Sequence, residues 1–299
     1  MVGGGGGAPE LQSGRPTEID PLGSRRSRIL GGVWQGEGAR SVAIAVASTV
    51  VFFAVVGWLI VHSSGWPTVR EAFFNGRIFR ESFPEILRAF RRNVALFMTA
   101  EVVILVFALF LAVLRSLPGP VFFPLRALAI GYADLFRGIP TILVIYILGF
   151  GAPTLGPGVP KSQFFWAVVA LVLVYSAYVS EVYRAGIESV HPSQVASARS
   201  LGLSRWKALR HVVIPQAVRR VVPPLLNDFI GLQKDTALVA SLGLVEAFRQ
   251  SQIDSSGTFN FTPYVATALL FVAITIPLAR FTDWLVARER RRRESGARL

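Results

Sequence analysis

Two adjacent ionisable residues, Lys234 and Asp235, stand in a segment that is otherwise largely apolar, residues 221–240. If that segment crosses a membrane, each ionised side chain costs about 2.5 to 3.5 kcal/mol on insertion scales, and such groups persist where they face a bundle interior or water. We therefore expect both residues to be functional. Neighbouring residues do not share a helix face, so we do not expect a mutual ion pair unless Pro223 and Pro224 open the backbone. The alternative role is an ion-pair network that ties neighbouring spans together.

The same segment contains weaker candidates for a polar site, namely Asn227, Asp228, Gln233 and Thr236. Asp228 lies near one end of the segment, where water can solvate it. Glu101 is a further ionisable residue inside an apolar run. For Glu101 we expect packing, or pairing with an arginine of a neighbouring helix, rather than contact with a substrate.

The residue types that serve enzymatic chemistry are missing or are not arranged for it. Without cysteine, the chain has no thiolate metal site and no cysteine nucleophile. None of its three lysines follows a glycine, so it lacks the GxxxxGK[ST] loop that cradles nucleotide phosphates. His62, His191 and His211 have no metal-ligand spacing. We therefore assign no catalytic residue, no cofactor and no metal site, and we do not expect the chain to be an enzyme.

The composition indicates an integral membrane protein. Hydrophobic residues make up 52% of the chain and charged residues only 16%, whereas soluble domains carry about 25% charged residues. The net charge of +13 does not indicate nucleic-acid binding. The basic residues lie at the ends of apolar runs and in the loops between them, which is typical of membrane topology.

We predict an all-α fold, a polytopic membrane helix bundle with six spans. Residues 41–61 form the first span, because they are uncharged and, at about 1.5 Å per residue, long enough to cross a hydrocarbon core of roughly 30 Å. This run is longer than the apolar part of a signal peptide. The other predicted spans are 93–114, 121–151 with a kink near Pro140, 164–180, 221–240 with an interruption, and 261–286.

These spans divide the chain into five predicted domains. They are a disordered cytoplasmic tail at 1–40, an additional N-terminal transmembrane span at 41–61, an extracytoplasmic or interfacial segment at 62–92, the main transmembrane domain at 93–287, and a basic cytoplasmic tail at 288–299.

Loop charges predict the orientation. The long connection 181–220 carries seven basic residues and the short loop 152–163 carries only Lys161, so the positive-inside bias puts the long connection, and with it both termini, in the cytoplasm. The extracytoplasmic segment 62–92 conflicts with this bias, since it contains six arginines, partly offset by Glu71, Glu81 and Glu85.

A polar stretch within the long connection has the pattern of two short helices separated by a glycine. His191 to Trp206 supply the first helix and the break at Gly202, and Pro215 is expected to stop the second helix. Such a unit at the membrane surface is a rigid protrusion that a soluble partner protein can bind. The alternative is an ordinary interfacial loop.

This stretch resembles the coupling loop of the amino-acid branch of bacterial ABC importer permeases. The family pattern is Glu-Ala-Ala, three residues, Gly, nine residues, then Ile-x-Leu-Pro. Here Ala196 takes the place of the Glu, so one acidic docking contact is missing, while the spacing is kept. The resemblance implies that the loop, about residues 185–215, docks into a separate ATPase subunit through Ala196, Ser197, Ala198, Arg199, Leu201, Gly202, Leu203, Ser204 and Pro215.

Further motifs extend the resemblance over residues 84–290. Phe136, Arg137, Gly138 and Pro140 look like the family's Phe-Arg-Gly-x-Pro. Residues 171–186 look like its span before the coupling loop, and 223–237 like its next span. The first span, 41–61, is an addition to the family's usual core of five helices.

The resemblance implies that the chain is a transport subunit of the bacterial cytoplasmic membrane. Its partners would be two ATPase subunits, an extracytoplasmic binding protein, a second copy or a homologous permease, and membrane lipids. Lys234 would bind the α-carboxylate and Asp235 the α-ammonium of a polar amino acid such as glutamine or glutamate, with Thr236, Asn227 and Gln233 nearby. Basic substrates are less favoured, because the neighbouring Ala237 and Leu238 supply no further carboxylate.

Two other functions remain possible from the sequence. An ion-coupled secondary transporter would use the intramembrane Asp and Lys without an ATPase, but such folds often contain internal repeats, and we find none. A non-transporting scaffold or receptor is disfavoured by the polar residues within the spans.

Overall fold

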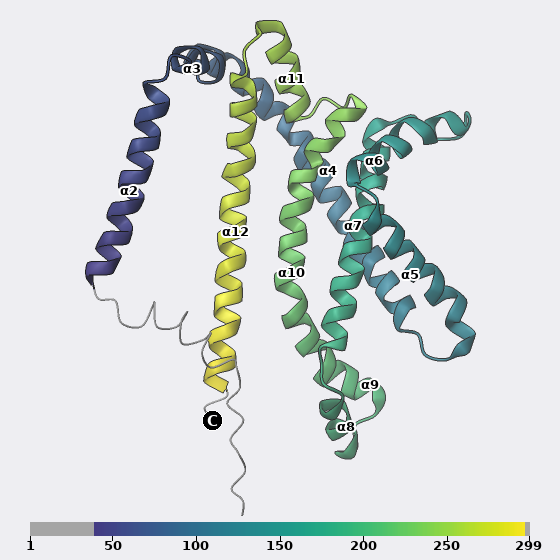
Figure 1. Cartoon of the computed structure of the whole chain (residues 1–299). Helices are drawn as coiled ribbons and strands as arrows, with labels where there is room; N and C mark the ends of the chain where they lie inside the picture. Colours follow the sequence, from purple (N-terminus) through teal and green to yellow (C-terminus); the bar gives the residue numbers. More distant parts are fainter. Residues whose placement is uncertain (1–38, 297–299) are drawn as a thin grey trace, which may run out of the picture. The chain divides into compact units, whose positions relative to one another are not determined.

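The structure, a computed structural model, describes residues 39–296. This part of the chain consists of helices and connecting loops and contains no strand (Figure 1). The predicted all-α fold class is confirmed. The chain divides into two compact units, residues 1–66 and 67–299. Of the predicted tail at 1–40, residues 1–38 lie outside the described part of the chain.

Helix α2 (Ala39–Val61) is the described helix of the first unit. Its segment Ser41–Val61 is long and apolar enough to cross a membrane. Large apolar side chains along it, such as Val51 and Phe53, are exposed. A helix that is apolar all round suits a lipid environment. The predicted first span therefore coincides with one helix, and its role stays a prediction.

The second unit contains the remaining helices (Figure 1). The α-helices are α3 (Trp66–Phe73, which begins one residue before the unit), α4 (Gly76–Ser116), α5 (Phe123–Gly138), α6 (Thr141–Tyr146), α7 (Gln163–Glu188), α8 (Pro192–Ser200), α9 (Arg205–Ala208), α10 (Ile214–Asp235), α11 (Ala247–Thr258) and α12 (Thr262–Gly296). Short irregular helices connect them: η1 (Pro120–Phe122), η2 (Ile147–Gly151), η3 (Ala152–Leu155), η4 (Leu209–Val213) and η5 (Thr236–Leu242).

The predicted number of six spans is not confirmed. Among the described residues, four helices are long and apolar enough to cross a membrane, or five if the bent pair α5 and α6 is counted as one span. The missing candidate is α10, which carries Arg219, Arg220, Asp228, Lys234 and Asp235. A helix with that many ionisable groups reaches membrane depth only where other helices or water cover its polar face.

Three helices extend beyond the predicted spans. α4 begins at Gly76, so most of the segment predicted as interfacial belongs to the same 41-residue helix as the second span. α7 continues to Glu188 instead of ending at 180. α12 runs to Gly296 through most of the predicted basic tail, since arginine and glutamate are good helix formers once the helix has started.

The core lies where α7 packs against α4. Small and branched side chains alternate at this contact, with Ala100 and Ile104 of α4 and Ala167, Ala170 and Leu171 of α7 all fully buried. Alanines let the two backbones approach closely, which drives helix association in a membrane, where lipid tails are as apolar as the side chains. α7 thereby becomes the central element to which α5 and α10 also attach.

The chain breaks at Pro140 instead of kinking there. We expected one long helix over 121–151, but α5 ends at Gly138 and α6 begins at Thr141, and the two are bent by 104°. Ile139 is extended, with φ −98 and ψ 130, because the ring of a following proline disfavours the helical conformation of the preceding residue. The break places Thr141 at the start of a new helix.

Proline has the opposite effect on α10. We expected Pro215 to stop a helix, but it lies in the first turn of α10, where its missing N–H is not needed. Pro223 and Pro224 do not interrupt α10 either. The interruption predicted for this span occurs later, where α10 ends at Asp235 and η5 continues.

A buried polar network fastens η5 and α11 to α4. The Asn93 side-chain amide nitrogen donates to Thr236 Oγ1 at 3.1 Å and to Glu246 Oε2 at 2.8 Å. Its carbonyl oxygen accepts from the Ala247 backbone N–H at 3.0 Å. Asn93 is 2% exposed and Glu246 is fully buried, so each group depends on the others for hydrogen bonds.

Glu246 also caps α11. Its carboxylate accepts from the backbone N–H groups of Phe248 at 2.9 Å and Arg249 at 2.8 Å, which have no partner within the helix. Burial raises the pKa of Glu246, and the hydrogen bonds from Phe248, Asn93 and Arg249 oppose that rise. A further hydrogen bond connects α4 to this region, since Arg92 Nη1 donates to the carbonyl of Val245 at 2.6 Å.

We predict that Gly186→Ala destabilises the contact between α7 and α10. A Cβ at Gly186 would overlap Val221 Cγ2 and lie 3.4 Å from the carbonyl oxygen of Ala217. Overpacking of this kind costs about 1 to 3 kcal/mol. The thermal unfolding midpoint of the full chain in detergent should fall for Gly186→Ala and recover in Gly186→Ala/Val221→Ala.

The matched control is Gly131→Ala in α5, where nothing lies within 4 Å of an added Cβ. This change should leave the midpoint unchanged or raise it, because alanine is preferred over glycine within a helix by about 0.5 to 1 kcal/mol. Equal midpoints for Gly186→Ala and Gly131→Ala would disprove the close contact.

We predict that Asn93→Ala lowers stability by about 1 to 3 kcal/mol, because it leaves the buried Ala247 N–H without a partner and removes one of the hydrogen bonds to the buried Glu246 carboxylate. Val94→Ala is the control, since Val94 is the next residue on α4 and is 44% exposed. Chemical unfolding in mixed micelles measures both. A smaller loss for Asn93→Ala than for Val94→Ala would contradict a structural role for the network.

Candidate functional site

Helix α10 carries a polar face through the bundle. Asn227, Gly231 and Lys234 are spaced by four and three residues and so lie on one side of the helix. Asp228 and Asp235 are seven residues apart and share the adjacent side. Asn227 and Lys234 are exposed, and the two aspartates are half-buried.

Asp235 is held by neutral hydroxyl groups from two other helices. The Tyr175 hydroxyl of α7 donates to Asp235 Oδ2 at 2.9 Å, and the Thr141 side chain of α6 also hydrogen-bonds Asp235. Tyr175 can approach because residue 231 is a glycine, whose added Cβ would lie 3.2 Å from the tyrosine hydroxyl. Thr141 is available because the chain breaks at Pro140. Three helices therefore meet at one carboxylate.

Lys234 does not share these contacts. Its side chain is exposed, and no ion pair joins it to Asp235 in the described part of the chain. The two hydrogen-bond partners of Asp235 are therefore uncharged, and the exposed Lys234 ammonium group acts on the carboxylate electrostatically without a direct ion pair.

Gln233 and Thr236, which we also predicted at the site, point elsewhere. Gln233 is 6% exposed, and its Oε1 accepts from Thr275 Oγ1 of α12 at 3.0 Å. Thr236 is fully buried, donates to the Gln233 carbonyl at 2.7 Å and accepts from Asn93. Both residues fix the end of α10 to α12 and α4, and neither contacts Asp235 directly.

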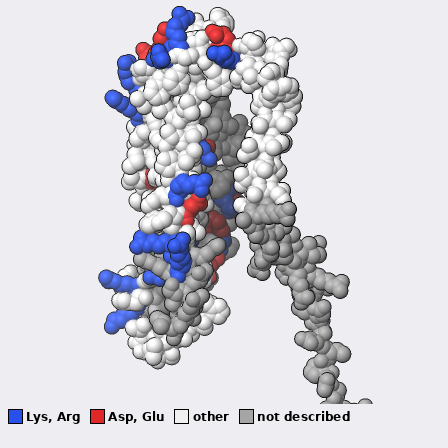
Figure 2. Space-filling view, turned by 90° about the vertical axis from the view of Figure 1, so that its left-hand side faces the viewer, with Lys and Arg blue, Asp and Glu red and all other residues white. Residues whose placement is uncertain are grey.

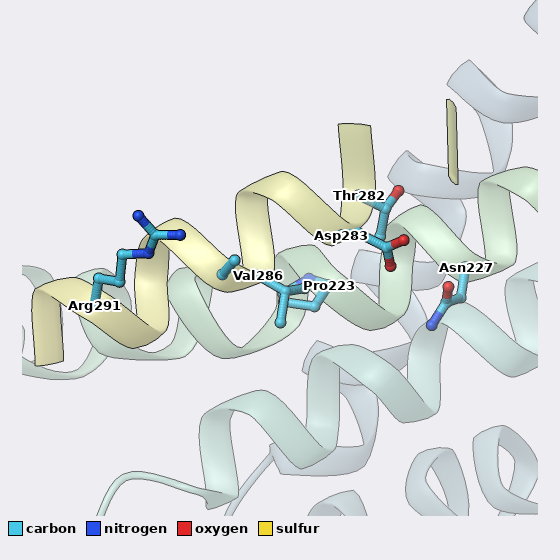
Figure 3. Close-up of a pocket in the computed structure, with 7 residues that line it drawn as sticks. Pro223, Asn227, Thr282, Asp283, Val286 and Arg291 are labelled. Atoms are coloured by element: carbon cyan, nitrogen blue, oxygen red, sulfur yellow. The ribbon is translucent and has the colours of Figure 1, made fainter. Parts of the chain in front are cut away.

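Asn227 lies in a separate pocket between α10 and α12 (Figure 3). The pocket has a volume of about 460 Å³ and is lined by Pro223 and Asn227 of α10 and by Thr282, Asp283, Val286, Ala287 and Arg291 of α12. In Figure 3, Asn227 faces the part of α12 that carries Thr282 and Asp283. Asn227 is two helical turns from Lys234, about 10 Å along the axis, so the structure does not bring it to Asp235.

A second cavity lies next to Asp235. It has a volume of about 560 Å³. Its walls come from α6 and η2 (Ile142, Tyr146, Phe150), from η5 and the glycine that follows (Ala237, Leu238, Ala240, Ser241, Leu242, Gly243), and from α11 (Phe248, Arg249, Gln252). Ile142 directly follows Thr141, and Ala237 comes two residues after Asp235. This cavity is large enough for an amino acid.

The predicted glycine break between the two short helices α8 and α9 is confirmed. α8 ends in a Schellman motif, in which the N–H of Leu203 bonds the carbonyl of Ala198 at 3.2 Å and that of Gly202 bonds the carbonyl of Arg199 at 3.0 Å. Gly202 has φ +84, a conformation that side-chain-bearing residues rarely adopt. The Ser204 hydroxyl then caps α9 by accepting from the Lys207 N–H at 3.3 Å.

Most side chains of this loop are free to meet a partner. Leu201 is 83% exposed and Trp206 64% exposed at the tip between α8 and α9. The other exposed positions are Ala196, Ser197, Arg199 and Ser204, whereas Ala198 is buried and Leu203 is partly buried. In Figure 1 this unit forms one end of the bundle and α11 the other. Pro215 lies outside the loop, in the first turn of α10.

Charged residues form a cluster at the end of α7, before the loop begins. Arg115 at the end of α4 pairs with Glu181 of α7 at 2.8 Å, and Arg184 bridges Glu181 and Glu188. Glu101, for which we expected an arginine partner, makes no ion pair in the described part of the chain and faces Asp228 instead. The charge cluster therefore stiffens the last turns of α7 before α8.

Sequence reasoning missed Tyr175, Thr141, Asn93 and Glu246. A signal exists for Thr141, which directly follows the Phe-Arg-Gly-x-Pro motif at 136–140. Asn93 is a polar residue at the start of an apolar run, and it could have been singled out on the same grounds as Glu101. Tyr175 and Glu246 carry no such signal, because their partners are distant in the sequence.

The chain is similar to proteins of known family. A model of the binding-protein-dependent transport system inner membrane component matches residues 105–291. The probable amino-acid permease protein YxeN of Bacillus subtilis (strain 168) is 32% identical over 65% of this chain and 87% of its own length. The probable glutamine ABC transporter permease protein GlnM of the same organism is 35% identical over 56% of this chain and 77% of its own length.

A solved structure has the same fold. The crystal structure of an amino acid ABC transporter with histidines matches with a TM-score of 0.62 and 32% identity, over 70% of this chain and 94% of that one. The family model covers more than half of the chain. The two relatives are named as permeases, and the solved structure is that of an amino acid ABC transporter. The chain therefore belongs to the family of binding-protein-dependent transport system inner membrane components, in which its relatives are amino-acid ABC transporter permeases.

Proposed function

We propose that the chain is the permease subunit of an ATP-binding cassette importer that carries a polar amino acid, of the glutamine or glutamate type, across the cytoplasmic membrane. Two separate ATPase subunits drive it, an extracytoplasmic protein delivers the substrate, and a second copy or a homologous permease completes the pathway. Transport follows alternating access between two arrangements of the bundle.

The observation that carries this proposal is the environment of Asp235. Its carboxylate is half-buried and bound by two uncharged hydroxyl groups, from Tyr175 and Thr141. Its charge is therefore oriented but not neutralised. The α-ammonium group of an amino acid supplies the missing positive charge, and the exposed Lys234 next to it supplies a partner for the α-carboxylate. The pair recognises the zwitterion common to all amino acids.

The cavity beside Asp235 supports a polar, uncharged or acidic side chain. Tyr146, Ser241, Arg249 and Gln252 are its hydrogen-bonding side chains, and Arg249 Nη1 donates to Gln252 Oε1 at 2.9 Å. The lining residues include no carboxylate that would pair with a basic side chain. A relative named as a probable glutamine permease agrees with this substrate class.

The loop of α8 and α9 is the docking element for the ATPase in this proposal, and it lies in the cytoplasm with both termini. Exposed Leu201 and Trp206 offer apolar contact area, and the exposed Arg199 and Ser204 surround it. Movement of the loop reaches the substrate site through α7, because α7 carries both Glu181, near the loop, and Tyr175, at Asp235. A rigid α7 transmits the displacement between them.

We predict that Asp235→Asn lowers uptake by roughly tenfold to a hundredfold while the protein still inserts into the membrane. The amide keeps the size and the contact with Tyr175 but removes the negative charge, and a hydrogen bond to a charged group contributes about 1.5 to 3 kcal/mol. The measurement is uptake of radiolabelled glutamine by proteoliposomes that contain the complete transporter.

Asp283→Asn is the control, since Asp283 is an exposed aspartate of α12 whose side chain is 69% accessible. Its uptake should equal that of the parent protein. Unchanged uptake by Asp235→Asn would remove Asp235 from the substrate site.

We predict that Gly202→Val uncouples uptake from ATP hydrolysis, whereas Gly202→Asn has a mild effect. Nothing lies within 4 Å of an added Cβ at Gly202, so only the positive φ penalises a side chain. Valine is strained there by roughly 1 to 2 kcal/mol, and asparagine tolerates this conformation. Substrate-stimulated ATPase activity of the assembled transporter measures the coupling.

Equal activities for Gly202→Val and Gly202→Asn would mean that the left-handed conformation has no role in coupling. Gly131→Ala serves again as the control for a helical glycine with open space around it.

A further inference from the structure

The outward face of α4 changes from basic to apolar along one continuous stripe. The residues of the stripe follow one another at steps of three or four. The basic part contains Arg77, Arg80, Arg88 and Arg91, with Pro84 between the two pairs. The apolar part contains Ala95, Met98, Val102, Val106, Leu109 and Val113. Steps of this size keep residues on one side of a helix. The apolar members are well exposed, with Met98 at 55%, Val102 at 61% and Val106 at 68%.

The opposite side of α4 faces the core, which shows that the stripe points away from the bundle. Ile86 and Ile104 are fully buried, and Phe90 is 6% exposed. Phe90 packs edge-on against Phe271 of α12, with ring centroids 5.3 Å apart.

The guanidinium groups of the four arginines have no binding partner in the described part of the chain. Their side chains are exposed, and none of them takes part in an ion pair or a side-chain hydrogen bond there. Burial raises the pKa of Asp254 of α11, and the charge of Glu85, beside the stripe, adds to that rise. Figure 2 shows basic side chains gathered, with some acidic ones, at the end of the bundle formed by α3, the start of α4 and α11.

We propose that this stripe binds one anionic phospholipid, with the headgroup phosphate on Arg88 and Arg91 and the acyl chains along Met98, Val102 and Val106. The guanidinium group matches a phosphate in charge and shape. From Arg91 to Val106 the helix rises about 22 Å, and half a bilayer measures roughly 20 to 22 Å. The part of the stripe from Arg91 to Val106 therefore has about the length of one phospholipid, headgroup and acyl chains together.

Charge and hydropathy together favour a lipid over other occupants. An acidic soluble protein would satisfy the arginines but leave the apolar half uncovered. A second copy of this chain, packed through the same stripe, would bring like charges together. A lipid site also accounts for the excess of arginine at the end of the bundle opposite α8 and α9, where the positive-inside bias disfavours it.

The absence of cysteine in the natural sequence allows a site-specific test with the full chain. Ala95→Cys, between the basic and the apolar half, is labelled with a bimane fluorophore and reconstituted into nanodiscs. Brominated phosphatidylglycerol and brominated phosphatidylcholine, mixed in turn with unbrominated lipid, quench the fluorophore from the lipid position beside it. The ratio of the two quenching curves gives the relative binding constant.

The expected preference for phosphatidylglycerol is about thirtyfold, from about 1 kcal/mol for each of two arginines near an anionic headgroup. Arg88→Gln/Arg91→Gln should abolish the preference. Arg77→Gln/Arg80→Gln should keep most of it, since this pair lies about 16 Å farther along the helix. Inorganic phosphate should not displace the lipid.

Three results would overturn the proposal: no preference in the parent protein, an unchanged preference in Arg88→Gln/Arg91→Gln, or loss of the preference in Arg77→Gln/Arg80→Gln alone. If poly-glutamate binds through Arg88 and Arg91 and displaces phosphatidylglycerol from the label, the surface instead belongs to an acidic protein partner.

Discussion

The hydrogen bond from the Tyr175 hydroxyl to the Asp235 carboxylate, 2.9 Å long, joins α7 to the last residue of α10. A half-buried ionisable group requires polar partners, because an apolar core does not solvate it. Tyr175 and Thr141 orient the carboxylate but bring no positive charge. The rest of the bundle is arranged around this requirement: Gly231 leaves room for the tyrosine, and the break at Pro140 turns α6 toward the site.

The same helix that carries Tyr175 leads directly to the loop of α8 and α9. α7 ends in the cluster of Glu181 and Arg184, and its Gly186 packs directly on Val221 of α10. On the other side, Asn93 and Glu246 hold η5 and α11 to α4. Because these contacts are close-packed or buried, the coupling that we propose would pass a displacement at the end of α7 on to α10 with little local adjustment. The fold thus provides a mechanical path between the loop and Asp235.

Local chemistry made part of this architecture predictable. The cost of charge in an apolar run singled out Lys234 and Asp235, and the helix-glycine-helix pattern predicted the left-handed Gly202. Pairings between distant segments were not predictable, so Tyr175 and Glu246 were missed. Gln233 and Thr236 were grouped with Asp235 by proximity in the sequence, but the 100° turn per residue sends them to α12 and α4. Proline was misjudged twice, since Pro140 forces the preceding Ile139 out of the helical conformation, whereas Pro215 lies in a first turn where its missing N–H is not needed.

Reconstituted uptake tests the central claim, that a separate motor drives substrate past Asp235. Proteoliposomes are prepared with this chain alone, and with the chain together with its ATPase subunits and binding protein. The accumulation of labelled glutamine is followed with and without ATP on the side of the membrane where the ATPase subunits lie. The account predicts accumulation only when ATP and all subunits are present, and none from a proton or sodium gradient. Gradient-driven accumulation by the chain alone would contradict it and would identify an ion-coupled transporter.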